Sequence, residues 1–349
     1  MTQPNRPNAV LAFVRARWFL CLMLALIPIG FAFGRSAPGG GGDVGPYAGY
    51  VVAGVLFLMS LTLNSRALAA SIAKPLPVLW ACAVCLLVMP GFAWFASRWQ
   101  LSEDFRLELA AVASVPCTMA AASVWTRRAG GNDAVSLLTT LLTNGLCFAY
   151  TPWLLVWLAG QSVEMDARAM AVRLVYTALM PAAAGQASRL LLSRFVDVDR
   201  LKTALGVVAQ SGILLIIFGS SFKAGGQLTS AADLGGGAAI AVLTASCVAV
   251  HLAAAAAAWW GGRAIGLSKP DATATVFAGS QKTLPIAMLV VTDPAMLGGS
   301  GIPLAPVPVL LYHAMQLFVD TLIADRMART VNAEDRLLEC RSKDSRSRD

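Results

Sequence analysis

The sequence predicts an all-α polytopic membrane protein with ten transmembrane helices. Of its 349 residues, 57% are hydrophobic and only 13% are charged, about half the charged share of a soluble domain. The apolar residues also gather into ten segments, each of roughly the 20 residues that a helix needs to cross a hydrocarbon core of about 30 Å. We therefore expect the chain to lie in a lipid bilayer, without a separate soluble domain.

The ten segments follow one another through short polar connections. In chain order they are expected at residues 17–34, 47–64, 76–97, 107–126, 133–159, 169–191, 203–222, 234–260, 272–292 and 303–324. The fourth and ninth are the weakest, because each is short and contains a proline, Pro116 or Pro285. Arg15 and Arg17 before the first segment resemble the start of a signal peptide. We expect that segment to be retained, because its removal would leave nine spans and disturb the charge pattern.

The basic residues orient these spans. With a cytoplasmic N-terminus, 20 of the 27 lysines and arginines fall in cytoplasmic segments and six in external ones. Because loops rich in Lys and Arg stay in the cytoplasm, both termini are expected there. The same placement explains the net charge of +8, so this charge does not indicate binding to nucleic acid.

Ten spans with both ends on one side divide into two halves of five. Because five is odd, the second half must insert upside down relative to the first. The sequence thus predicts two inverted five-helix repeats, residues 1–160 and 161–330, followed by a charged cytoplasmic tail, residues 331–349, that is expected to be disordered. The interrupted segments hold the fourth place in each half, and paired broken helices in inverted repeats mark a substrate site near the membrane midplane.

The sequence contains no motif that indicates an enzyme or a metal site. Six of the seven cysteines lie in apolar segments, so no disulfide framework is expected. His251 and His313 are far apart and have no Cys or carboxylate at metal-binding spacing. We expect a protein that is not an enzyme and has no cofactor except, at most, a sodium ion; the sequence does not indicate its oligomeric state.

Lys282 is the most informative single residue. It lies in the middle of an apolar run, about 15 Å from either membrane surface at 1.5 Å per residue. A lysine at that depth costs about 2.5–3.5 kcal/mol, and the nearby Gly279 and Pro285 weaken a continuous helix. A buried charge at a broken helix in the membrane indicates a transport site.

The surroundings of Lys282 leave several roles open. Ser280, Gln281 and Thr283 provide oxygen atoms suited to an alkali cation, with which the ammonium would compete. Lys282 can instead pair with an anionic substrate, exchange a proton, or form a structural ion pair with Asp320 in the tenth span. Three more polar residues lie near Asp320 on that span, where they either line a pore or pack against another helix: Tyr312, His313 and Gln316.

The fourth segment has its own break at Pro116, close to Thr118. Carbonyls freed by a proline must find partners in neighbours, water or an ion, although an ordinary kink explains the same residues. The next segment carries a polar stripe on one helical face: Ser136, Thr140, Thr143 and Asn144. The stripe either lines an aqueous or ionic site or bonds back to its own helix.

Several sequence motifs, in the same order along the chain, resemble those of a known transporter family. Phe277–Pro285 (FAGSQKTLP) is similar to the ninth-helix signature of bacterial transporters in the bile acid:sodium symporter superfamily, in the branch related to the cotransporter 7 group. Four more stretches agree with it: Leu56–Asn64, Thr126–Ser136, Met180–Arg189 and Tyr312–Asp320. The resemblance implies ten helices in two inverted five-helix repeats, with discontinuous helices 4 and 9 crossing in a core domain and a panel domain that moves against it.

The resemblance also implies a sodium site behind the crossing, of which part is matched. The matching ligands are Ser136, Thr140 and Gln281. Ser123 stands where relatives have Asn, Cys85 where they have Gln, and Phe277 where they have a glutamate that touches both sodium ions. Lys282 replaces a neutral Asn. Because a carboxylate is lost and an ammonium gained, we predict that Lys282 takes the role of a bound cation.

These observations together predict a secondary transporter of the bacterial inner membrane that moves a small organic anion by alternating access, coupled to sodium, to protons or to no ion. The alternative is a non-transporting membrane regulator of the same fold. The candidate residues for substrate or ion binding are Pro116, Thr118, Ser123, Ser136, Thr140, Asn144, Ser280, Gln281, Lys282, Thr283 and Asp320.

Overall fold

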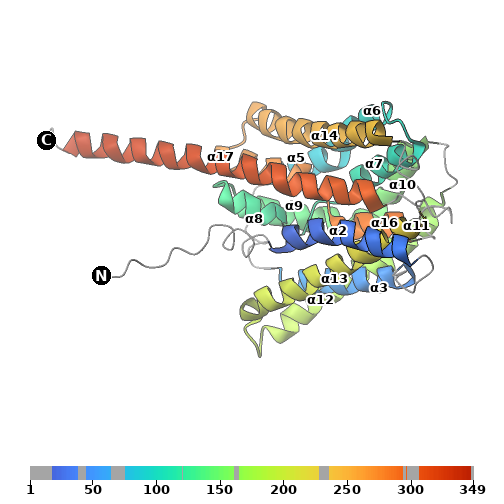
Figure 1. Ribbon diagram of the computed structural model, residues 1–349. Helices are drawn as coiled ribbons and strands as arrows, with labels where there is room; N and C mark the ends of the chain where they lie inside the picture. The colour runs from blue at the N-terminus through green and yellow to red at the C-terminus, as the bar shows by residue number, and fades with distance from the viewer. Residues whose placement is uncertain are drawn as a thin grey trace, which may run out of the picture.

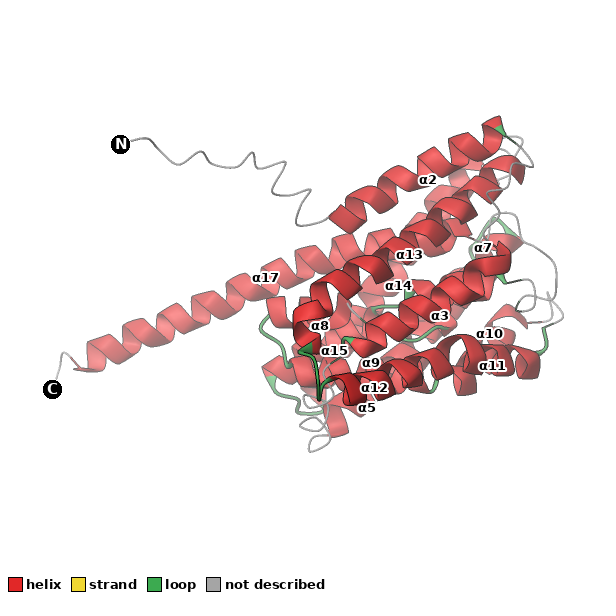
Figure 2. Ribbon diagram, turned by 90° about the horizontal axis from the view of Figure 1, so that it is seen from below, coloured by secondary structure: helices red, strands yellow, loops and turns green. Residues whose placement is uncertain are grey.

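The computed structural model describes residues 18–37, 45–63, 75–119, 121–160, 165–227, 236–293, 296 and 306–346. Every regular element within these ranges is a helix, and the longer helices run side by side (Figures 1 and 2). The start of the first of these helices and the end of the last lie at the same end of the bundle (Figure 1). The prediction of an all-α membrane protein is confirmed.

The helices cover all ten predicted segments, several of them in pieces. In chain order they are α2 (Trp18–Ser36), α3 (Gly45–Leu61), α5 (Pro75–Ala83), the π-helical turn η1 (Val84–Val88), α6 (Met89–Ser97), α7 (Glu103–Ser114), α8 (Ala121–Arg128), α9 (Asp133–Gly145), α10 (Cys147–Ala159), α11 (Ala167–Leu174), the π-helical turn η3 (Val175–Leu179), α12 (Met180–Leu192), α13 (Val198–Gln227), α14 (Gly236–Ala264), α15 (Lys269–Ser280), α16 (Leu284–Thr292) and α17 (Pro306–Arg346). Within the described residues, six helical segments are long and apolar enough to span a membrane, or seven if α9 and α10, bent by 72°, form one span. Ten crossings in two inverted repeats stay a prediction.

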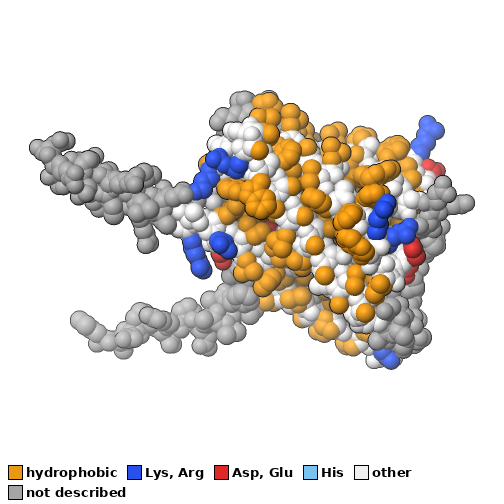
Figure 3. Space-filling view, turned by 90° about the horizontal axis from the view of Figure 1, so that it is seen from above, with side chains coloured by type: hydrophobic (Ala, Val, Ile, Leu, Met, Phe, Trp, Pro, Cys, Tyr) orange, Lys and Arg blue, Asp and Glu red, His pale blue; other side chains and the backbone are white. Residues whose placement is uncertain are grey.

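The surface of the bundle suits a bilayer. Figure 3 shows a broad band of hydrophobic side chains over the middle of the molecule, with Lys and Arg side chains gathered toward its two ends. Large apolar side chains on several helices are exposed, among them Leu87, Trp157 and Leu215. A soluble monomer rarely exposes an apolar area of this extent, so lipid contact is the expected environment.

Two groups of helices pack within the bundle. One consists of α2, α3, α12 and α13, which contact one another in the pairs α2–α13, α3–α12 and α3–α13. The other surrounds α15, which contacts α5, α8, α9 and α14. Each group draws on both halves of the sequence, so the predicted repeats 1–160 and 161–330 would be related by symmetry and not be separate packing units.

Glycines let α2 and α13 approach closely. A Cβ atom added at Gly225 of α13 would overlap the carbonyl oxygen of Phe31, and one added at Gly34 of α2 would overlap the carbonyl oxygen of Phe222. These are backbone atoms, which cannot rotate away as a side chain can. The two helices therefore depend on residues without a side chain at these positions.

We expect Gly225→Ala to lower the free energy of unfolding by about 1–3 kcal/mol, because the methyl group must force α2 and α13 apart. Thermal unfolding of the purified protein in detergent measures this. Gly206→Ala is the matched control on the same helix, because a Cβ there has nothing within 4 Å. Equal midpoints for the two variants would contradict the close contact.

The last helix is longer than the sequence predicted. α17 continues to Arg346 and so includes most of residues 331–349, which were expected to be a disordered tail. The segment contains Ala, Glu, Leu and Arg, which have favourable helix propensity, and it follows directly on a stable helix. The mixed charge that suggested disorder is equally compatible with a solvated helix.

Candidate functional site at the contact of two broken helices

Two broken helices meet in the interior of the bundle. One break separates α7 from α8 and the other separates α15 from α16, so both interruptions expected from Pro116 and Pro285 are present. Neither proline has an N–H to continue a helix. The backbone N–H of Thr283 in the second break donates to the carbonyl oxygen of Pro116 in the first, at 2.9 Å. The two breaks are thus in direct contact.

The first break leaves six consecutive carbonyl groups outside a helix or at its end, and each accepts a hydrogen bond. The donors are Lys282 Nζ to Ala113 and Val115, Thr151 Oγ1 to Ser114, Thr283 N to Pro116, Asn144 Nδ2 to Cys117, and Thr140 Oγ1 to Thr118. Backbone groups in a membrane protein must be satisfied internally. Here protein donors satisfy all six.

Lys282 binds more of these backbone carbonyls than any other donor does. Its ammonium donates to the carbonyl oxygens of Cys85 at 2.7 Å, Ala113 at 2.7 Å and Val115 at 2.9 Å, and the residue is 2% exposed. An ammonium has three N–H donors, so the three carbonyls use all of them. Two of the carbonyls belong to the C-terminal end of α7, where the helix dipole favours a positive charge.

The third carbonyl, that of Cys85, has no partner within its own helix because of another proline, Pro90. In the π-helical turn η1, the N–H of Met89 bonds to the carbonyl of Val84, five residues earlier. The same spacing would pair the carbonyl of Cys85 with the nitrogen of Pro90, which has no hydrogen. The wide turn therefore leaves one carbonyl without a helical partner, and Lys282 binds it.

The last helix holds the second break in place. The side-chain amide of Gln316 in α17 accepts from the backbone N–H of Lys282 and donates to its carbonyl oxygen, both at 2.9 Å. Tyr312 donates to the carbonyl oxygen of Ser280 at 3.2 Å, and His313 hydrogen-bonds to Gln316 at 2.8 Å. Of the two roles left open for the polar face of this span, helix packing is the one observed.

Asp320 of α17 has partners other than the one expected. Its two carboxyl oxygens contact His251 Nε2 of α14 at 2.9 Å and Gln281 Nε2 at 2.6 Å, and the residue is fully buried. Of the alternatives for Lys282, the structural ion pair with Asp320 is not formed, because the lysine side chain extends to α7 and η1 instead. His251 thus has a carboxylate partner, which lies 69 residues away along the chain.

The residues matched to a sodium site do not assemble into a complete one. The Ser136 hydroxyl and Gln281 Oε1 are buried and lack hydrogen-bond partners among the described residues, as ligand atoms awaiting an ion would. Thr140, however, donates to the carbonyl of Thr118, and Phe277, fully buried, supplies no oxygen where a carboxylate is needed. Two orphan oxygens without a carboxylate do not fit the two-ion site that the resemblance implies.

The other predicted residues are dispersed. Ser123 bonds to Asp133 and to Arg127 at the turn between α8 and α9, so the structure does not bring it to the contact of the breaks. The hydroxyl of Ser280 bonds back to its own helix, and that of Thr283 has no partner among the described residues. Within the polar stripe, Thr143 bonds back to its helix, whereas Asn144 and Thr140 bind the first break.

Three buried residues were not among the predicted site residues. Thr151 and His251 bind the first and second break, and Glu108 is a fully buried carboxyl group on α7. For His251 a signal existed, since an ionisable residue inside an apolar segment is unusual, whereas Glu108 lay at the edge of its predicted segment. Thr151 carried no such signal, because a single hydroxyl in an apolar helix is common.

Comparison with known proteins agrees with this geometry. A model of the SBF-like CPA transporter family matches residues 17–329. The chain is 24% identical to sodium/bile acid cotransporter 7 of Danio rerio over 326 residues, which cover 90% of this chain and 94% of that protein. It is 26% identical over 254 residues to the uncharacterized protein PA2026 of Pseudomonas aeruginosa, covering 72% and 74% of the two chains. It is also 26% identical over 291 residues to the probable sodium/metabolite cotransporter BASS4, chloroplastic, of Oryza sativa subsp. japonica, covering 79% and 67%.

The family match extends over nearly the whole chain and includes both breaks and Lys282. The resemblance seen first in Phe277–Pro285 is confirmed, and the protein is a multi-pass membrane protein of the SBF-like CPA transporter family.

Proposed function

We propose that this protein is a secondary transporter that moves a small organic anion across a bacterial inner membrane by alternating access, with Lys282 as a built-in cation at its centre. In this proposal the chain crosses the membrane ten times in two inverted repeats, with both termini in the cytoplasm. Its membership of a transporter family supports transport, and the relative from Pseudomonas aeruginosa supports a bacterial membrane.

The observation that carries the proposal is the coordination of Lys282. Three carbonyl oxygens within 2.9 Å of the ammonium are the ligands that an alkali cation would take at a broken helix. The ammonium is covalently attached, so it cannot dissociate from the crossing as a bound ion can. Sodium is then not required to hold this part of the site together.

The same charge supports an anionic substrate. The carbonyls that bind Lys282 are neutral, so its charge is not cancelled by a carboxylate in contact with it. The half-helices α8 and α16 begin near the breaks and add the positive ends of their dipoles. At 4 Å and an effective dielectric constant of 20, a unit negative charge would gain about 4 kcal/mol from such an ammonium.

Motion between the two helix groups would provide alternating access. Arg173 of α11 forms an ion pair at 2.8 Å with Asp293, directly after α16. α11 continues into α12, which packs with α3 in the group away from the breaks. This ion pair therefore ties that group to the broken helix, and it would have to open when the groups separate.

Thermal unfolding of the purified protein in detergent tests the proposal. We expect some small carboxylates or sulfonates to raise the midpoint in choline as well as in sodium, because Lys282 replaces the ion. A ligand at 100 times its Kd stabilises by about 2.7 kcal/mol. Stabilisation by an anion that requires sodium would contradict the built-in cation, and uptake of the stabilising anion into proteoliposomes would establish transport.

A further inference from the structure

We infer that Glu108 is a proton-binding site, through which a proton serves as the coupling ion of this transporter. The inference rests on the proposed transport function, but it concerns a residue away from the contact of the breaks. Glu108 lies in the second turn of α7, and neither the sequence motifs nor the contacts of Lys282 assign it a role.

Its environment is unusual for a carboxyl group. Glu108 is fully buried, and neither of its carboxyl oxygens has a hydrogen-bond partner among the described residues. An ionised carboxylate is severely destabilised at such a position unless it is paired, and it becomes neutral instead. The described conformation therefore holds Glu108 in its protonated form.

Among the described residues, no base or cation forms a hydrogen bond with Glu108 that would hold its charged form. Asp104, one turn earlier on α7, is an acid and disfavours a second negative charge nearby. Among the helices packed against α7, α6 and α16 carry no titratable residue. The others carry groups that form no hydrogen bond to Glu108: Cys147 and Tyr150 on α10, and Tyr312, His313 and Asp320 on α17.

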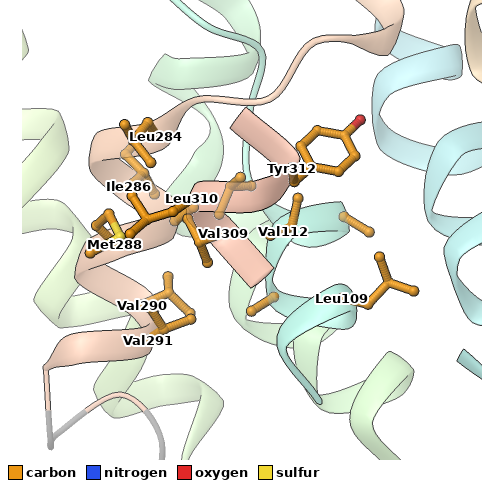
Figure 4. Packing of buried hydrophobic residues seen from close by; sticks show 14 of the residues in the cluster. Leu109, Val112, Leu284, Ile286, Met288, Val290, Val291, Val309, Leu310 and Tyr312 are labelled. Carbon is orange, nitrogen blue, oxygen red and sulfur yellow. The ribbon is translucent and has the colours of Figure 1, made fainter. Parts of the chain in front are cut away.

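Apolar packing covers the part of α7 that directly follows Glu108. Leu109 and Val112, on the same helix, lie in a cluster with Val309, Leu310 and Tyr312 of α17 and with the apolar side chains of α16 (Figure 4). Any motion that separates α7 from these helices brings water to the carboxyl group. The O–H bond then breaks, the proton passes to a water molecule, and the carboxylate remains.

The charge on Glu108 then controls closure. The carboxylate cannot return to the dry packing until it takes a proton from water, so each closing step needs one proton. Glu108 and Ala113, one of the residues whose carbonyls bind Lys282, lie on the same half-helix, about 7.5 Å apart along its axis at 1.5 Å per residue. A change at Glu108 is thus transmitted through α7 to the site at the breaks.

Infrared spectroscopy of the full chain in lipid nanodiscs, without any added ligand, tests this. At neutral pH we expect a carbonyl stretch of a protonated carboxyl group that disappears in Glu108→Gln, whose amide has the same shape. Transfer to heavy water is expected to shift this band, because a proton carrier must exchange with solvent. Glu103→Gln is the control and keeps the band, since Glu103 is exposed and paired with Arg106.

Three results would overturn the inference: no such band in the unaltered protein, a band that survives in Glu108→Gln, or a band that does not shift in heavy water. The last would mean that the proton is locked in a purely structural acid. The thermal midpoint of Glu108→Gln shows that the variant is folded. These spectra need neither substrate nor Lys282. A negative result therefore contradicts the role of Glu108 alone, whereas a lack of stabilisation by anions contradicts the proposed transport function.

Discussion

Replacing Lys282 with methionine is expected to destabilise the protein by several kcal/mol and to make its stability depend on the cation in solution. Methionine keeps an unbranched side chain but donates no hydrogen bond, so three buried carbonyl oxygens lose their partner. Each such loss costs about 1–3 kcal/mol. In sodium or potassium a cation can bind the vacated carbonyls, so the variant should unfold at a higher temperature there than in choline.

The measurement is thermal unfolding in detergent at equal ionic strength, with the unaltered protein beside the variant. Lys202→Met is the control, because Lys202 is exposed at the start of α13 and its replacement removes a charge without uncovering a carbonyl. If Lys282→Met were as stable as the control in all three salts, the ammonium would not hold the breaks together. Transport by Lys282→Met without any requirement for a cation would equally exclude its role as a built-in ion.

The positions of the two breaks could be read from the sequence because their causes are local. Pro116 and Pro285 lack an N–H, so each removes a helical hydrogen bond whatever surrounds it. Lys282 was identifiable for a similar reason, since its depth in an apolar run follows from counting residues. The same breaks divide the chain into pieces such as α7 and α8, which are too short to register as membrane spans by length and composition.

The partners of the site residues depended on the packing of distant helices, which spacing does not encode. Asp320 was considered as a partner of Lys282 because the two are opposite charges in adjacent spans. The lysine side chain instead extends to α7. The carboxylate of Asp320 binds His251, which is 69 residues away along the chain. The Cys85 carbonyl is a partner only because a π-helical turn precedes Pro90, and such a turn is not visible in composition.

Glu108 was missed for a different reason. The fourth span was placed at residues 107–126, so the carboxyl group fell near its edge, where a polar residue is ordinary. In the structure α7 begins at Glu103 and is buried along nearly all of its length. Burial, not distance from the predicted span end, decides how costly the charge is.

Replacing Asp320 with alanine is expected to lower the free energy of unfolding by several kcal/mol, because it leaves two buried donors without an acceptor and each such loss costs about 1–3 kcal/mol. The substitution removes the acceptor of both His251 and Gln281, and Gln281 already has an amide oxygen without a partner among the described residues. The second break would then be held by Gln316 and Tyr312 alone among its described contacts to α17.

Asp325 provides a matched control on the same helix, five residues later. It forms an ion pair with Arg128 at 2.5 Å, but both side chains are partly exposed, at 34% and 43%. Exposed pairs contribute about 0–1 kcal/mol, so Asp325→Ala should unfold close to the unaltered protein. The stability of Asp320→Asn should fall between those of the two alanine variants. Its amide keeps one oxygen acceptor but turns its NH2 group toward the N–H donor of His251 or Gln281. If both alanine variants lost equal stability, Asp320 would stabilise the protein no more than a surface carboxylate does. The hydrogen bonds of Asp320 to His251 and Gln281 could then not be what fixes the conformation of the second break.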